Sequence, residues 1–347
     1  MRAMASPSPA VGGTGLALPL NLALPVRAFV EVAAEAEVAG YDRLWAAEAG
    51  NNDAFGLLTA VALGTRAVGL ATGVVPIYTR TPSLVAQSAA TLQDVSGGRF
   101  TLGVGTSSKT IVERWNGTPY DQPLGRIKEY VDVVRRLLAG EKLDHTGVFY
   151  DVHGYQLLLN NPSPPPPIII GALNEQMLRA GGEVADGVCL NWIGAHAVAA
   201  ALAHVRAGRR PTSNACFVRV CVTDDVGSVR RWARREVMSY VTVPAYRKAF
   251  GVQGWGAVTE KAMELWAGGD RKGAAASLPD ELLDTLVLAG DAAEVRQRFE
   301  AYRAAGVDEP VALLVSGQSA PAAARAELAA TTAALAPKAR GRIAGNR

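Results

Sequence analysis

Residues 71–106, ATGVVPIYTRTPSLVAQSAATLQDVSGGRFTLGVGT, hold a strand, a turn, a helix and a second strand in one pass. Segment 70–75 is apolar and contains two valines, as expected of a buried strand. Two prolines end it, because proline has no backbone N–H to offer a ladder. Ser83 then provides an N-cap for a helix that stops at the Gly97-Gly98 pair. Residues 99–105 form the next strand, so the stretch predicts a βαβ unit with parallel strands.

Strand and helix patterns alternate along most of the 347 residues. Eight strands with intervening helices predict an α/β fold, a (β/α)8 TIM barrel. A doubly wound open sheet is the alternative, but its glycine motif would follow the first strand, whereas Gly12-Gly13-Thr14-Gly15 precedes it. The predicted strands cover residues 15–20, 41–48, 70–75, 99–105, 167–171, 188–193, 215–222 and 311–315.

Two connections are too long for simple crossovers, so we expect insertions after strands 4 and 7. In the first, residues 140–161 are polar and aromatic and predict a small hairpin. In the second, residues 227–288 are mostly helical in pattern. The predicted organisation is a flexible tail at 1–14, a single barrel domain at 15–336 and a basic tail at 337–347.

Composition narrows the function classes. The formal net charge of +3 is small for this length and gives no basis for nucleic-acid binding. No apolar run reaches the roughly 18 residues of a membrane span. The three cysteines lack CxxC spacing, and we expect buried free thiols in a protein of the reducing cytoplasm. The four histidines lie too far apart for a local ligand set, so no metal site is predicted.

The strand ends of the opening stretch combine small and polar residues. Ligands of parallel α/β folds bind at the carboxyl ends of strands. Gly73-Val74-Val75 ends one strand, and Gly103-Val104-Gly105 ends the other, before Ser107 and Ser108. Small residues let a flat ring approach the backbone, and hydroxyls give it hydrogen-bond partners. The Gly-x-Gly pair alone is more typical of a tight strand-to-loop turn than of a ligand site.

A family resemblance rests on three segments: TGVVPIYTRTP (72–82), SGGRFTLGVG (96–105) and GALNEQMLRAGGEVADGVCLNW (171–192). Together they resemble the luciferase-like monooxygenase superfamily, most closely the branch that uses the deazaflavin coenzyme F420. The resemblance implies a TIM-barrel oxidoreductase that transfers a hydride between F420 and a small organic substrate, with a C=C or C=N bond as the group reduced. It also implies a cis peptide between Gly73 and Val74, and a homodimer formed through helices 54–64 and 83–95.

The resemblance also assigns the cofactor site. The ring is expected over Gly73, Val74 and Val75, with Ser107 and Ser108 beside it. The phosphate of the cofactor side chain is expected at the loop made of Gly171, Ala172, Leu173 and Asn174. Free N–H groups and the positive helix end independently suit an anion at that loop. The usual Gly-Pro of the family is Asn174-Glu175 here, and the acid at 175 competes with a phosphate.

Glu48 ends the second strand, where barrels place catalytic groups. Many deazaflavin enzymes of the family carry an Asp-His pair at this place, whereas this chain has Glu48-Ala49 and no imidazole. The proton-donor candidates are therefore Glu48, Tyr78 and Glu113. The alternative for Glu48 is a structural bond to a neighbouring loop.

The remaining strand-end candidates are expected to contact substrate: Arg80, Trp115, Asn191 and Trp192. For the two tryptophans, capping of the barrel core is the alternative. Two other functions stay open beside the F420 enzyme. One is an FMN-dependent monooxygenase that uses oxygen on the same fold, and the other is a non-catalytic flavin-binding barrel.

Overall fold

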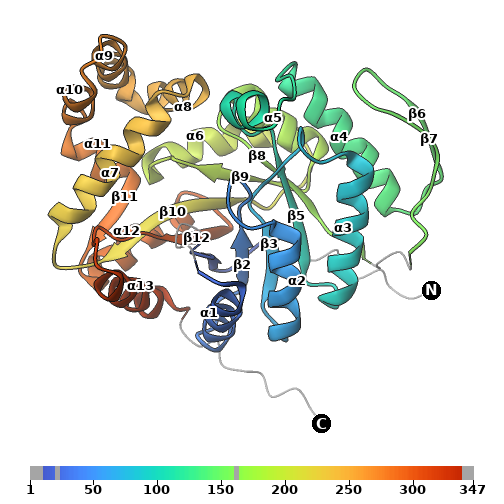
Figure 1. The fold of residues 1–347 in the computed structure, drawn as a ribbon, viewed down its shortest axis with the longest axis horizontal. Coiled ribbons are helices and arrows are strands. Elements are labelled where there is room, and N and C mark those ends of the chain that lie inside the picture. Colours follow the sequence, from blue (N-terminus) through green and yellow to red (C-terminus); the bar gives the residue numbers. More distant parts are fainter. Residues whose placement is uncertain (1–10, 20–23, 160–163, 338–347) are drawn as a thin grey trace.

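Eight parallel strands close into a barrel at the centre of the molecule (Figure 1), which confirms the predicted TIM barrel. The computed structural model describes residues 11–19, 24–159 and 164–337. Each strand pairs in parallel with the next, and the last pairs with the first to complete the ring. Around the barrel they are β1 (Gly15–Ala17), β2 (Arg43–Ala46), β3 (Gly69–Thr72), β5 (Phe100–Gly105), β8 (Ile168–Gly171), β9 (Gly187–Asn191), β10 (Ala215–Val222) and β12 (Glu309–Leu314).

Helices surround this barrel (Figure 1), and each buries an apolar face against the strands. They are α1 (Val26–Val38), α2 (Ala54–Gly64), α3 (Pro82–Val95), α4 (Pro123–Leu138), α5 (Glu175–Val184), α6 (Ala195–Arg206), α12 (Ala292–Ala304) and α13 (Pro321–Leu335). The expected tails fall largely outside the described residues, namely 1–10 of the first and 338–347 of the second. No helix of the described part is long and apolar enough to cross a membrane.

The start of α3 differs from the prediction. Thr81, not Ser83, is the N-cap, and its hydroxyl accepts from Leu84 N at 3.3 Å. Pro82 occupies the first helical position, where a missing N–H costs nothing and the fixed φ suits the helix. Ser83 therefore lies inside the first turn.

Both predicted insertions are present. After the fourth barrel strand come the π-helical turn η1 (Thr110–Trp115) and, beyond α4, the antiparallel hairpin of β6 (Leu143–Thr146) and β7 (Asp151–Tyr155). After the seventh comes a helical group with its own apolar core, at the upper left of Figure 1. It consists of α7 (Val226–Val241), α8 (Pro244–Phe250), η2 (Gly251–Trp255), α9 (Gly256–Ala267), α10 (Arg271–Ala276) and α11 (Asp280–Leu286).

The end of this second insertion corrects the sequence interpretation. Residues up to 288 were expected to be mostly helical, but Val287–Gly290 form a strand, β11, parallel to the second half of β10. Its sequence, VLAG, is too short and too uniformly apolar for periodicity to separate a strand from a helix.

The barrel interior is layered from its closed end to the mouth, the open end at the carboxyl ends of the strands. At the closed end, fully buried Glu309 accepts from Trp45 Nε1 at 2.6 Å and from Arg43 Nε at 3.1 Å. In the middle, the Trp45 and Phe217 rings pack edge to face at 5.5 Å. Because side chains two residues apart share a strand face, Asn191 and Arg219 belong to the next layer, at the mouth. That layer is unusually polar for a barrel interior.

The three cysteines are free and buried, as predicted. Burial raises the pKa of the Cys216 and Cys221 thiols to about 12, so neither is a thiolate at neutral pH. They therefore pack as small apolar side chains and offer no nucleophile.

Candidate active site at the barrel mouth

An interruption between β3 and β4 (Val75–Pro76) lies at the mouth, on the β3 side of the barrel wall. The peptide bond between Gly73 and Val74 is cis, which confirms the prediction. Gly73 N donates to Ala46 O at 2.8 Å, and Glu48 N donates to Val74 O at 3.3 Å. These bonds hold the interrupted segment against the end of β2 and bring Glu48 beside it.

The Thr72 hydroxyl replaces the missing backbone pairing to β5. It donates to Gly103 O and accepts from Gly103 N, both at 2.8 Å. A Cβ on Gly103 would collide with Thr72 O, and one on Gly105 would lie 2.5 Å from a Val74 methyl. Gly171 of β8 lies under the same side chain, since its Cβ would be 3.3 Å from Val74 Cγ1. These glycines make room for the interrupted segment, a packing role that differs from both sequence-based interpretations of the Gly-x-Gly pair.

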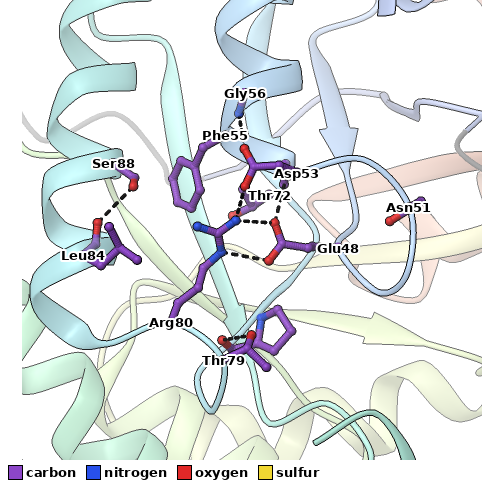
Figure 2. Close-up of polar contacts among 12 residues, drawn as sticks. Glu48, Asn51, Asp53, Phe55, Gly56, Thr72, Thr79, Arg80, Leu84 and Ser88 are labelled. Atoms are coloured by element: carbon purple, nitrogen blue, oxygen red, sulfur yellow. Dashed lines mark hydrogen bonds and ion pairs between the residues drawn. The ribbon is translucent and has the colours of Figure 1, made fainter. Parts of the chain in front are cut away.

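Glu48, Arg80 and Asp53 form a charged cluster at the mouth, drawn in Figure 2. Arg80 Nε and Nη2 donate to the two Glu48 oxygens at 2.8 and 2.7 Å, a bidentate pair, and Nη2 also pairs with Asp53. The hydrogen bonds that Arg80 donates to Glu48 are the main cause that raises the pKa of Arg80 above its usual value. Glu48 also accepts from Ala54 N at 3.0 Å, so it helps to begin α2.

Arg80 is held from two further directions. Its guanidinium lies 5.1 Å from the centroid of the Phe55 ring, and Figure 2 shows that ring beside it. Its carbonyl accepts from Tyr130 O–H at 3.1 Å. Asp53, the other acid of the cluster, caps α2 by accepting from Gly56 N at 2.5 Å. The charged cluster is thus a rigid junction of β2, α2 and the segment before α3.

A cavity of about 350 Å³ adjoins this cluster. Glu48 and Arg80 line one wall, and Ile111 and Asn116 of the η1 region line another. Both charged side chains are only about one-sixth exposed, at 16% and 15%. A small molecule in this cavity would therefore meet a fixed carboxylate and a fixed guanidinium at close range.

The other two proton-donor candidates lie elsewhere. The Tyr78 hydroxyl donates to Asp121 O at 2.6 Å, and its ring packs on Tyr120 at 5.1 Å. Burial raises the pKa of Tyr78 well above its usual value, so it stays protonated. Glu113, on η1, accepts from Tyr120 N at 3.4 Å and is 37% exposed beside Lys109. Neither side chain lines the cavity that Glu48 lines.

The predicted substrate residues fall into two groups. Arg80 belongs to the charged cluster, and Trp115 lies near it, with an exposed ring that approaches the Gly50 position. Asn191 and Trp192 lie on the other side of the mouth, where β9 ends. Trp192 has a left-handed backbone conformation, with φ of 53°, and is almost fully buried.

Arg219 of β10 contacts both Asn191 and Trp192. Its Nη1 donates to Asn191 Oδ1 at 2.9 Å, and its Cζ lies 3.3 Å from the centroid of the Trp192 ring. Tyr240 and Tyr246 of the helical insertion continue the aromatic wall, with ring centroids 4.6 Å apart. Burial is the main influence on Arg219, and it lowers the pKa of the guanidinium.

The loop from Gly171 to Asn174 has the features of an anion site. The Asn174 side chain caps α5 by accepting from Met177 N at 3.0 Å. Among the described residues, no acceptor is found for the backbone N–H groups of Leu173, Asn174, Glu175 and Gln176. Glu175 is exposed and lies 3.7 Å from His204. Free donors and a helix N-terminus together favour a phosphate here.

Ser107 and Ser108 follow β5 on the same mouth. Ser107 has a left-handed backbone with φ of 59°, and the Ser108 hydroxyl accepts from Ile111 N at 3.4 Å. No group of three or more metal-ligating side chains occurs in residues 11–19, 24–159 and 164–337.

Sequence reasoning missed Arg219, Asp53 and Thr72. An Arg inside the apolar run ACFVRVCV was a signal, because a charge on a buried strand needs a reason. The roles of Asp53 and Thr72 depend on partners brought together by folding, and only the capping role of Asp53 had a local signal.

Comparison with known proteins shows which family the sequence matches. A model described as luciferase-like monooxygenase matches residues 6–309. A 5,10-methylenetetrahydromethanopterin reductase of Archaeoglobus fulgidus is 30% identical over 290 residues, which cover 80% of this chain and 86% of the relative. A putative coenzyme F420-dependent oxidoreductase of Mycobacterium tuberculosis is 29% identical over 330 residues, which cover 84% and 93%.

Solved structures share the fold. A coenzyme F420 dependent tetrahydromethanopterin reductase of Methanopyrus kandleri superposes with a TM-score of 0.75 at 21% identity, covering 94% of this chain and 98% of that one. An F420-dependent secondary alcohol dehydrogenase, in complex with an F420-acetone adduct, gives 0.70 at 17%, covering 92% and 99%. An FMN complex of a Baeyer-Villiger monooxygenase component from Pseudomonas putida gives 0.65 at 18%, covering 94% and 98%. At these identities the likeness concerns the fold alone, and it spans both cofactors.

Proposed function

This chain belongs to the luciferase-like monooxygenase family, and from that premise we propose that it is an F420-dependent oxidoreductase. The reaction proposed is hydride transfer between the deazaflavin and a small organic substrate, with a C=C or C=N bond as the group reduced. The M. tuberculosis relative, matched over most of both chains, is named as a putative F420-dependent oxidoreductase, which supports the choice of cofactor. The observation that carries the proposal is a mouth with a donor-rich loop on β8 and a charged cavity at β2.

The residues at this mouth fit the cofactor. The free N–H groups that follow Gly171 are suited to the phosphate, and they supply donors without a lysine. Gly73 and Val74 are partly exposed at the mouth, as are Ser107 and Ser108, so a flat ring has a surface to cover. We therefore assign the ring to Gly73, Val74, Ser107 and Ser108, and the phosphate to residues 171–174. Val75, expected beside the ring, is fully buried and offers it no surface.

Hydride transfer at carbon is the chemistry that a bound deazaflavin supplies. The chain's own task is to orient the substrate, exclude water and handle a proton. Glu48 is the best placed of the three candidates for the proton, because it alone lines the cavity. Its two oxygens already accept from Arg80, which fixes their direction.

Glu175→Gln is expected to tighten F420 binding roughly two- to fivefold, because it removes a like charge beside the phosphate at the start of α5. Fluorescence titration with F420 at low salt measures this change, and high salt should reduce it. Glu35→Gln, which removes an exposed charge from α1, is the matched control and should leave the Kd unchanged. Weaker binding of F420 by the Glu175 variant would contradict the assignment of the phosphate to this loop.

An anaerobic assay tests the proposed reaction. Purified protein with F420 and a panel of enones and imines should change the deazaflavin absorbance in step with substrate reduction. Turnover that needs FMN and consumes oxygen would favour the monooxygenase alternative. A lack of turnover with F420 and with FMN alike would favour a non-catalytic barrel.

We also propose that two copies pair through α2 and α3. Leu63 of α2 and Leu84 of α3 are exposed, at 77% and 44%, which suits an apolar contact. The protein mass from light scattering at micromolar concentration tests this pairing.

A further inference from the structure

Arg219 is a buried cation that no carboxylate of the described residues contacts, since Glu236 acts on it only at longer range. Its side chain is 5% exposed, and in the part of the chain that the structure describes no Asp or Glu forms an ion pair with it. An arginine stays charged in proteins, and buried charges are normally paired. Its one side-chain hydrogen bond within the described residues goes to the neutral amide oxygen of Asn191.

Two other arginines of the barrel region have acceptors within the chain for their charged side chains. Arg43, inside the closed end, pairs with Glu309 at 3.1 Å. Arg99, at the foot of β5, donates to the carbonyl oxygens of Ser96, Val68 and Ala62. Within the described residues Arg219 has neither kind of arrangement, so its charge is available to a ligand.

The position of Arg219 points to the mouth. Its neighbour two residues earlier, Phe217, faces inward, since a Cβ on Gly73 would lie 2.6 Å from the Phe217 ring. Arg219 shares that strand face and lies one layer nearer the mouth. Strands β3 and β10 are separated by three strands on either side of the ring, so Arg219 lies across the mouth from Gly73 and Val74.

Aromatic side chains line one side of the guanidinium. It stacks on Trp192, whose buried Nε1 finds no hydrogen-bond partner among the residues that the structure describes. The Trp192 ring in turn contacts Tyr240 at 4.8 Å. Burial raises the pKa of Tyr246 above its usual value, although the charge of Arg219 and a hydrogen bond with Asn191 oppose that shift, so its hydroxyl stays a neutral donor. Apolar walls around one fixed cation suit a flat molecule that carries one negative group.

We propose that Arg219, held in place by Asn191 and Trp192, binds a carboxylate of the substrate, which makes the substrate class organic acids with a flat apolar portion. This inference rests on the proposed function, because a ring on the Gly73–Val74 side would turn its open face toward Arg219. The planar guanidinium matches a carboxylate with two parallel hydrogen bonds, which a lysine at this place would not provide.

Benzoate and its neutral isostere benzamide are the probes. With F420 bound, calorimetric titration of the unaltered protein should give a Kd for benzoate at least about tenfold below that for benzamide. Arg219→Met should abolish this preference, and Arg219→Lys should retain only part of it. The F420 Kd should stay within about twofold in both variants. Arg231→Met, which removes an exposed arginine of α7, should leave the preference intact.

Equal binding of benzoate and benzamide by the unaltered protein would overturn the proposal, whether or not the variants fold. A weaker F420 affinity in Arg219→Met, with the benzoate preference unchanged, would also overturn it and assign the guanidinium to the cofactor. If F420 does not bind at all, the proposed function fails, but the same two probes on the cofactor-free protein still decide the role of Arg219.

Discussion

Turnover of Glu48→Gln is expected to fall by about 10²–10³-fold, while the Kd for F420 changes by less than about twofold. Glutamine copies the shape of glutamate but does not exchange a proton at neutral pH. It also exchanges the bidentate ion pair with Arg80 for at most one neutral hydrogen bond. Steady-state turnover and fluorescence titration of the same preparation separate the two effects.

Asp53→Asn is the matched control for that variant. Asp53 is the second acid that pairs with Arg80, and it is 54% exposed. Asparagine keeps the α2 cap, since it is as good an N-cap as aspartate. We expect turnover within about threefold of the unaltered protein. An equal loss in both variants would mean that the charged cluster acts by placing Arg80, and normal turnover of Glu48→Gln would leave Glu48 a purely structural role.

Gly103→Ala is expected to lower the free energy of unfolding by about 2–4 kcal/mol. The backbone of Gly103 is not in the left-handed region, so the conformation itself permits alanine. The obstacle is contact: the new methyl group would collide with Thr72 O, a backbone atom that two hydrogen bonds of the same residue hold close. Chemical denaturation followed by circular dichroism measures the loss.

Gly227→Ala provides the comparison for Gly103→Ala. Gly227 lies in the first turn of α7, where a Cβ would meet its nearest atoms at 3.5 Å, an ordinary contact. Alanine is the better helix former, so stability should stay constant or rise by about 0.5–1 kcal/mol. Equal stability of the Gly103 and Gly227 variants would show that the Thr72 segment yields easily and does not define the mouth.

The barrel itself was predictable because its signals are local. Helix 54–64 and strand 215–222 have the expected bounds, since an Asp N-cap precedes the first and apolar β-branched residues fill the second. The cis bond at Gly73 followed from the family resemblance, not from the residues alone. The strand β11 was not predicted because four apolar residues carry no period. The cap of α3 was placed at Ser83, two residues too late, because serine is as common a cap as threonine.

The partners within the site were not predictable from the sequence. Glu48 and Arg80 are 32 residues apart, and nothing local to either residue indicates that they form a bidentate pair. Tyr78 had the right chemistry for a proton donor, but its hydroxyl is committed to the Asp121 carbonyl. Arg219 gave a visible signal in its strand, yet its lack of a carboxylate partner is evident only once β9 and β10 lie side by side.

The choice of cofactor is the central claim, and one titration tests it most directly. The purified protein is titrated anaerobically with F420 and, separately, with FMN, and the fluorescence change of each cofactor is followed to saturation. We predict saturable F420 binding at one site per chain, with a Kd at least about tenfold below that for FMN. Tight FMN binding without a measurable F420 signal would contradict the account and make the oxygen-dependent monooxygenase the better description.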